Sequence, residues 1–119
     1  MKKWSDHYFC RTRKEPYAML NEKIAKLLNT QINKEFYSAY LYLHFANFYV
    51  EQGLNGFANW YQIQAQEERD HALLMLQYLQ NNDAKVALEA IAQPDAVLKE
   101  NMDPLKACLL YTSDAADEL

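Results

Sequence analysis

Glycine and proline are scarce in this sequence. The chain of 119 residues contains two Gly and three Pro, while half of its residues are hydrophobic and 24% are charged. Collagen-like and disordered chains are much richer in Gly and Pro, and repeat arrays show a sequence period that this chain lacks. The composition therefore predicts one compact and largely helical domain.

Long hydrophobic runs are also missing. The longest uninterrupted runs, at 39–43, 72–76 and 107–111, contain five residues each, whereas a membrane-spanning helix needs roughly 18. Two lysines follow Met1, but no apolar segment comes after them, which argues against a secretory signal. We therefore expect a cytoplasmic protein with no membrane partner.

Cysteine and positive charge are the remaining scarce features. Cys10 and Cys108 lie near opposite ends, which gives neither a disulfide framework nor a Cys-x-x-Cys pair. The net charge is −4, yet residues 1–18 carry five Lys or Arg against two Asp or Glu. The acidic remainder disfavours nucleic acid as a partner. The uneven split suggests that residues 1–18 are a non-native upstream extension and that Met19 is the natural first residue.

Helix-forming residues dominate the rest of the chain. Residues 20–52 contain no Gly or Pro, and the predicted helix stops at Gly53. A second helical run covers about 56–82, with Asn55 or Gly56 as its N-cap. Because the link between the two helices is so short, they are predicted to lie antiparallel and in contact.

The third part of the chain begins with a crossover at 83–102, for which we expect an ordered path with one extra turn of helix. A third helix is predicted from 103, with Asp103 as N-cap and Pro104 at the first helical position. This order is typical of an all-α four-helix bundle with one long crossover. Only the first helix pair, the crossover and the start of the third helix are present.

Charged side chains interrupt the apolar stripes of both long helices. Glu35 lies in the middle of the first stripe, and Glu68 and His71 share the second. Their distances from Gly53 along the chain differ by at most three residues, or roughly 5 Å of helix rise, so the three can converge. Two buried carboxylates repel each other unless a cation lies between them, and this donor set suits iron or manganese. The alternative is a metal-free helical interaction module with partly solvated glutamates.

Three segments, 35–42, 53–60 and 66–72, resemble bacterial-type non-haem ferritin in the right order and spacing, and the likeness extends over residues 19–107. The resemblance implies a ferritin-like fold and a role in iron storage and detoxification. It also implies a homo-oligomeric cage that stores ferric mineral, and a dinuclear centre inside each subunit that oxidises Fe(II) with O₂ or peroxide. No haem is expected.

The resemblance also implies roles for single residues. Glu35 and His71 would ligate the first iron, and Glu68 would bridge both irons. Glu67 would help to bind a third, peripheral iron, although a solvated glutamate on the helix flank is an equal alternative. Tyr42 would lie beside the site as an electron donor, although packing alone would also place it there.

Other side chains of the first helix fall outside its inner stripe. His44 lies about 180° from Glu35 on a helical wheel and is interpreted as an outer-surface residue or an oligomer contact. Four aromatic residues are interpreted as subunit-contact surface, because a monomeric bundle would leave them wet; they are Phe36, Tyr40, Phe45 and Phe48.

The end of the chain departs from the family pattern. Residues 108–118 resemble the translation of a transposon-type sequencing adapter, so 108–119 is interpreted as a non-natural tail and the third helix is expected to be lost after Ala107. The family takes further ligands from its third and fourth helices, so this fragment is expected to bind one iron weakly and to oxidise little. A rubrerythrin-like di-iron peroxidase is the alternative enzyme. A haem-bridged bacterioferritin is disfavoured, because Met75 points inward with Glu68.

Overall fold

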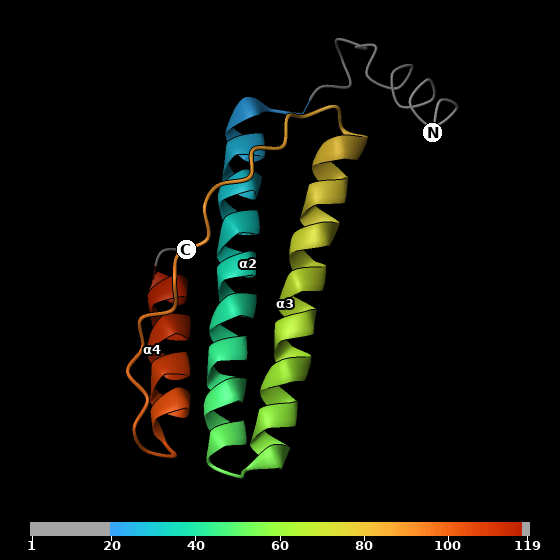
Figure 1. Cartoon of the computed structure of the whole chain (residues 1–119). Coiled ribbons are helices and arrows are strands. Elements are labelled where there is room, and N and C mark those ends of the chain that lie inside the picture. Colours follow the sequence, from blue (N-terminus) through green and yellow to red (C-terminus); the bar gives the residue numbers. More distant parts are fainter. Residues whose placement is uncertain (1–19, 118–119) are drawn as a thin grey trace, which may run out of the picture. The chain divides into compact units, whose positions relative to one another are not determined.

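The computed structural model describes the backbone of residues 20–117 and the side chains of residues 20–111. It contains α2 (Glu22–Glu51), α3 (Asn55–Asn81) and α4 (Asp103–Asp117) (Figure 1). No strand occurs in residues 20–117, which confirms the predicted all-α class. Over this same range, no helix is both long enough and apolar enough to cross a membrane. The predicted upstream extension, 1–18, lies outside the described residues.

The ends of α2 follow ordinary capping chemistry. Asn21 is its N-cap, because its side-chain oxygen accepts a hydrogen bond from the Lys23 N–H at 2.8 Å. At the other end Gly53 adopts a φ of +75°, a left-handed conformation that glycine reaches without strain. The Gly53 and Leu54 N–H groups then donate back to carbonyls of the last turn. A three-residue link is therefore enough to connect α2 to α3.

The start of α3 corrects the predicted cap. The helix begins at Asn55, and the Leu54 carbonyl accepts the hydrogen bond from the Ala58 N–H at 3.1 Å. Leu54 therefore occupies the N-cap position, where we had predicted Asn55 or Gly56. The correction follows from the tightness of the link, which starts the helix one residue earlier.

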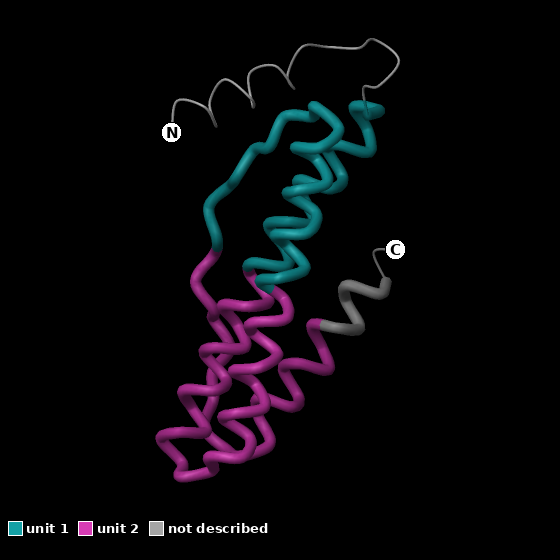
Figure 2. Tube along the Cα trace, turned by 90° about the vertical axis from the view of Figure 1, so that its right-hand side faces the viewer, with its two compact units in different colours: residues 1–36, 69–91 teal, residues 37–68, 92–119 magenta. Residues whose placement is uncertain are grey.

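The chain divides into two compact units, which are coloured separately in Figure 2: unit 1 contains residues 1–36 and 69–91, and unit 2 contains residues 37–68 and 92–119. In unit 1, Ile32 of α2 is buried together with Ala72 and Leu79 of α3. Ala84 and Val86 of the crossover pack against this small aliphatic cluster. Each helix therefore contributes one face to the core of unit 1.

Unit 2 has a larger, aromatic core. Phe45 and Tyr49 of α2 pack with Tyr61 of α3, and all three side chains are at most 1% exposed. Parts of the crossover and of α4 cover this cluster, namely Ala96, Leu98, Ala107, Cys108 and Tyr111.

This packing corrects the predicted subunit-contact surface of aromatic residues. Phe45 and Phe48 are buried, because the crossover and α4 cover a second face of α2 that a single-stripe wheel leaves open. Phe36 is half-buried, and only Tyr40, at 52%, is exposed.

The crossover has no helical turn between residues 84 and 99, so the predicted extra turn is wrong. Polar side chains of α2 bind its backbone instead. In unit 1 the Asn29 amide donates to the Lys85 carbonyl at 3.0 Å and accepts from the Ala87 N–H at 2.9 Å. Asn33 donates to the Glu89 and Ala90 carbonyls. These bonds satisfy backbone groups that a helix would have satisfied internally.

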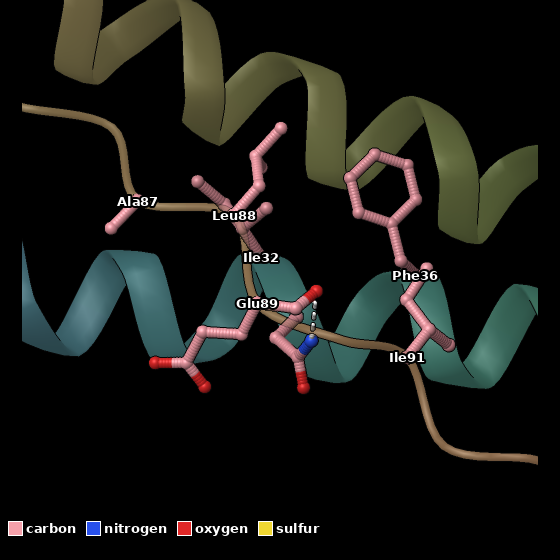
Figure 3. Close-up of a pocket in the computed structure, with 7 residues that line it drawn as sticks. Ile32, Phe36, Ala87, Leu88, Glu89 and Ile91 are labelled. Atoms are coloured by element: carbon pink, nitrogen blue, oxygen red, sulfur yellow. Dashed lines mark hydrogen bonds between the residues drawn. The ribbon is translucent and has the colours of Figure 1, made fainter.

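An open cavity of about 260 Å³ lies beside this anchored segment. Ile32 and Phe36 of α2 and Leu88 and Ile91 of the crossover are among the residues that line it (Figure 3). The Asn33 side chain, which also lines it, donates to the Glu89 carbonyl.

The crossover of unit 2 is held in a similar way. His44 Nε2 lies 3.0 Å from the Ala96 carbonyl, and the Tyr49 hydroxyl donates to the Asn101 carbonyl at 2.7 Å. The prediction that His44 is an outer-surface residue is therefore wrong, because its half-buried ring contacts the crossover.

The start of α4 differs from the prediction by one residue. The Met102 carbonyl accepts the hydrogen bond from the Lys106 N–H, so Met102 and not Asp103 is in the N-cap position. The Asp103 carboxylate turns back and accepts the N–H groups of Glu100 and Lys99 at 2.8 and 2.9 Å, which lowers its pKa. The helix continues to Asp117 and does not end at Ala107 as expected. The origin of residues 108–119 stays a prediction.

Candidate metal centre

Glu35 lies midway along α2 with its side chain 16% exposed. Oε1 accepts a hydrogen bond from Gln31 Nε2, one helical turn earlier, at 3.0 Å. Oε2 is buried and has no hydrogen-bond partner. A buried carboxylate oxygen without a donor is costly, and a bound cation would remove that cost.

His71 of α3 faces this oxygen within unit 1. Its Nδ1 lies 3.7 Å from Glu35 Oε2, which is longer than a hydrogen bond. Divalent first-row ions bind nitrogen and oxygen ligands at about 2.1 Å, and two ligand atoms 3.7 Å apart can then share one ion at an angle of about 120°. The His71 side chain is 54% exposed, so the same position is open to ions from solvent.

Glu68 completes the group from the same helix as His71. Residues three apart in an uninterrupted helix share a face, and α3 runs without a break from Asn55 to Asn81. Glu35, Glu68 and His71 each offer one ligand atom, and these atoms lie within 4.8 Å of one another. The structure therefore brings together the three residues that the sequence pattern singled out.

Tyr42 is half-buried in unit 2 beside the ring of Tyr61, with the two ring centroids 5.7 Å apart. Burial, the neighbouring Cys108 and the charge of Glu68 all raise its pKa, so the side chain is a neutral phenol. Cys108 Sγ lies 3.9 Å from the Tyr42 hydroxyl oxygen.

Two further residues near the site, Glu67 and Gln31, differ in how far the sequence predicted them. Glu67 is exposed and is not part of the group of three. Gln31 was missed by sequence reasoning, although its position four residues before Glu35 is the spacing at which helical side chains meet. Its hydrogen bond fixes one carboxylate oxygen of Glu35 and leaves the other aimed at His71.

A long helix pair that carries one glutamate and one Glu-x-x-His motif on facing sides is the arrangement of carboxylate-bridged metal proteins built on four-helix bundles. The Ferritin family model, described as a ferritin-like domain, matches residues 25–119. The chain therefore belongs to the ferritin family, which confirms the predicted resemblance and fold.

Individual relatives agree with this assignment. The chain is 40% identical over 85 residues to a bacterial non-heme ferritin of Campylobacter jejuni, which covers 71% of this chain and 51% of the relative. It is 38% identical over 96 residues to the protein of the same name from Staphylococcus saprophyticus, covering 81% and 58%. The chain thus spans about half the length of the curated relatives it matches.

The fold matches solved structures as well. An open pore ferritin from the archaeon Archaeoglobus fulgidus superposes with a TM-score of 0.75 at 35% identity, over 82% of this chain and 59% of that one. A structure described as a humanized archaeal ferritin gives a TM-score of 0.77 at 34% identity, over 82% and 60%.

Proposed function

We propose that the protein stores iron and binds Fe(II), its substrate, through Glu35, Glu68 and His71. The observation that carries this proposal is the buried Oε2 of Glu35, which has no hydrogen-bond partner and lies 3.7 Å from His71. A buried carboxylate oxygen without a hydrogen-bond donor is stabilised when a cation binds to it. Family membership supports iron as that cation.

In the complete protein, a dinuclear centre within each subunit oxidises Fe(II), and O₂ or peroxide takes the electrons. Glu35 and His71 bind the first iron, Glu68 bridges to the second, and Glu67 serves a peripheral third site. The ferric product is stored in a homo-oligomeric cage in the cytoplasm, without haem. Relatives named bacterial non-heme ferritin support this proposal.

For the chain of 119 residues itself we propose one iron per chain and little oxidation. Among the described side chains, 20–111, one group of three potential ligands occurs, and it is sufficient for one ion. A second iron needs ligands beyond this group.

Anaerobic calorimetric titration with Fe(II) tests the proposal. The 119-residue chain is expected to bind one Fe(II), and Glu35→Gln, which removes the charge but keeps the shape, is expected to lower the affinity by about 100-fold, or roughly 2.7 kcal/mol. Glu67→Gln is the matched control and should change the affinity of this site little. Equal affinities in the wild type and Glu35→Gln would contradict the proposal and favour the metal-free helical module.

A further inference from the structure

A row of oxidisable rings runs through unit 2 from Tyr42 to the surface. The ring centroids of Tyr42 and Tyr61 are 5.7 Å apart, and those of Tyr61 and Trp60 are 5.0 Å apart with the planes at 89°. Both separations fall in the 4.5–7 Å range of directly packed aromatic pairs. The three rings therefore form an unbroken series of contacts.

The rings of the row differ in exposure, and Tyr42 at its inner end is half-buried. Tyr61 is 1% exposed, whereas Trp60 is 52% exposed. At the inner end, Tyr42 lies close enough to Glu68 for the glutamate charge to affect its hydroxyl. The row thus connects the surroundings of a proposed iron ligand with solvent.

The middle ring, that of Tyr61, passes an electron on without becoming a stable radical. The Tyr61 hydroxyl is buried and has no hydrogen-bond partner. A phenol becomes a stable radical only if its proton can leave, and burial beside Cys108, which raises the pKa of Tyr61, holds that proton in place. An electron therefore passes through the Tyr61 ring without leaving a radical there.

A second branch of the row ends at a residue that cannot carry an electron onward. Tyr49 stacks on Tyr61 at 5.8 Å and on Phe57 at 5.2 Å. Phe57 is 50% exposed, but a phenyl ring is much harder to oxidise than a phenol or an indole. Trp60 is therefore the exposed ring at which this row can exchange electrons with a reductant in solvent.

We propose that Trp60 is the surface end of a one-electron path that runs through the ring of Tyr61 and re-reduces Tyr42 after Tyr42 has been oxidised. The inference rests on the proposed oxidation of Fe(II). Its electron source is a soluble one-electron reductant of the ascorbate class, and its oxidant is O₂ or peroxide.

The step balances as follows. Tyr42 gives one electron and its phenolic proton to O₂ or peroxide as these are reduced, and becomes a neutral phenoxyl radical. The indole of Trp60 transfers one electron through the Tyr61 ring, and the phenoxyl takes one proton from water. The indole radical cation releases its N–H proton to water, and it recovers one electron and one proton when the reductant is oxidised.

The test uses the full chain with Trp4→Phe in every variant, so that Trp60 is its only tryptophan. Because little sustained oxidation is expected of this chain, one equivalent of Fe(II) is oxidised once with hydrogen peroxide, and electron paramagnetic resonance follows the phenoxyl radical while ascorbate removes it. Trp60→Phe, which keeps a packed ring, is expected to slow this removal about tenfold, equivalent to about 1.4 kcal/mol on the barrier.

Tyr78→Phe is the matched control, because Tyr78 is 49% exposed on the same helix but belongs to unit 1. It should leave the rate unchanged. Equal rates of phenoxyl removal in the parent and in Trp60→Phe would overturn the path.

A metal-free measurement separates the path from the iron chemistry. Azide radicals made by pulse radiolysis oxidise Trp60 directly, and the same rings carry electrons in either direction. The indolyl radical is expected to decay faster in the parent than in Tyr42→Phe. If it does so while Fe(II) and peroxide give no phenoxyl, the path stands and the proposed iron oxidation fails. Equal decay with and without Tyr42 overturns the path itself.

Discussion

The two units are built on the same pair of long helices but have different cores. Unit 1 has a small aliphatic core, and it places the carboxylate of Glu35 opposite His71. Unit 2 has a core of packed aromatic rings, in which the Tyr61 hydroxyl is buried and Tyr42 is half-buried. In unit 1, the potential metal ligands Glu35 and His71 face each other, whereas in unit 2 aromatic rings pack directly against one another. The comparison indicates that the candidate ligands Glu35 and His71 and the packed aromatic rings lie on different stretches of the same helices.

The largest expected effect concerns the charge in unit 1. Replacing the buried, half-satisfied carboxylate in Glu35→Leu should abolish Fe(II) binding and stabilise the metal-free protein by about 1 kcal/mol, because a buried charge without full compensation is destabilising. Urea unfolding of the metal-free protein measures the second effect. A loss of stability in Glu35→Leu would show that the carboxylate serves the fold and not a cation.

The next effect concerns how unit 1 holds the crossover. Asn29→Ala removes hydrogen bonds to both Lys85 and Ala87, and a loss of about 2 kcal/mol is expected at roughly 1 kcal/mol per bond. Hydrogen exchange should then increase at the Ala87 N–H. Thr30→Ala, one residue along α2, is the matched control; exchange that is equally fast in both variants would contradict the anchoring role.

A pair of tyrosines in unit 2 gives a smaller effect with an internal control. The Tyr49 hydroxyl donates to the Asn101 carbonyl at 2.7 Å, whereas the Tyr61 hydroxyl has no partner. Tyr49→Phe is therefore expected to cost about 1 kcal/mol, and Tyr61→Phe should be neutral or slightly stabilising. Thermal unfolding of the two variants measures the difference. Equal melting temperatures would contradict the stabilising role of the hydrogen bond from Tyr49 to Asn101.

The smallest effect is the pH dependence that Asp103 contributes. Two backbone N–H groups lower its pKa in the folded protein, so its stabilising contribution is present above the unfolded pKa and is lost as the pH falls through the folded pKa. Asp103→Asn should remove this component of acid destabilisation. Unfolding curves of the wild type and Asp103→Asn, measured between neutral and acidic pH, test this. An equal loss of stability in the two proteins as the pH falls would contradict the role of Asp103.

The sequence predicted the parts of the fold that depend on local pattern. The absence of Gly and Pro in 20–52 predicts the long first helix, and α2 lies within that range. Glu35, Glu68 and His71 converge because their register follows from helix geometry and from the short link at Gly53.

Contacts between segments far apart in the chain could not be predicted in this way. A helical wheel assigns one buried stripe to α2, but the crossover and α4 bury a second face that includes Phe45 and Phe48. His44 was misplaced for the same reason, because the crossover segment it contacts is 52 residues away in sequence. The helical turn expected in the crossover is replaced by hydrogen bonds from α2 side chains such as Asn29.

The central claim is that Glu35, Glu68 and His71 bind one Fe(II) together. X-ray absorption of the chain loaded anaerobically with one Fe(II) tests it most directly. The account predicts carboxylate oxygens and one imidazole nitrogen as ligands, with the imidazole contribution lost in His71→Ala. Oxygen ligands alone, unchanged by His71→Ala, would contradict the account.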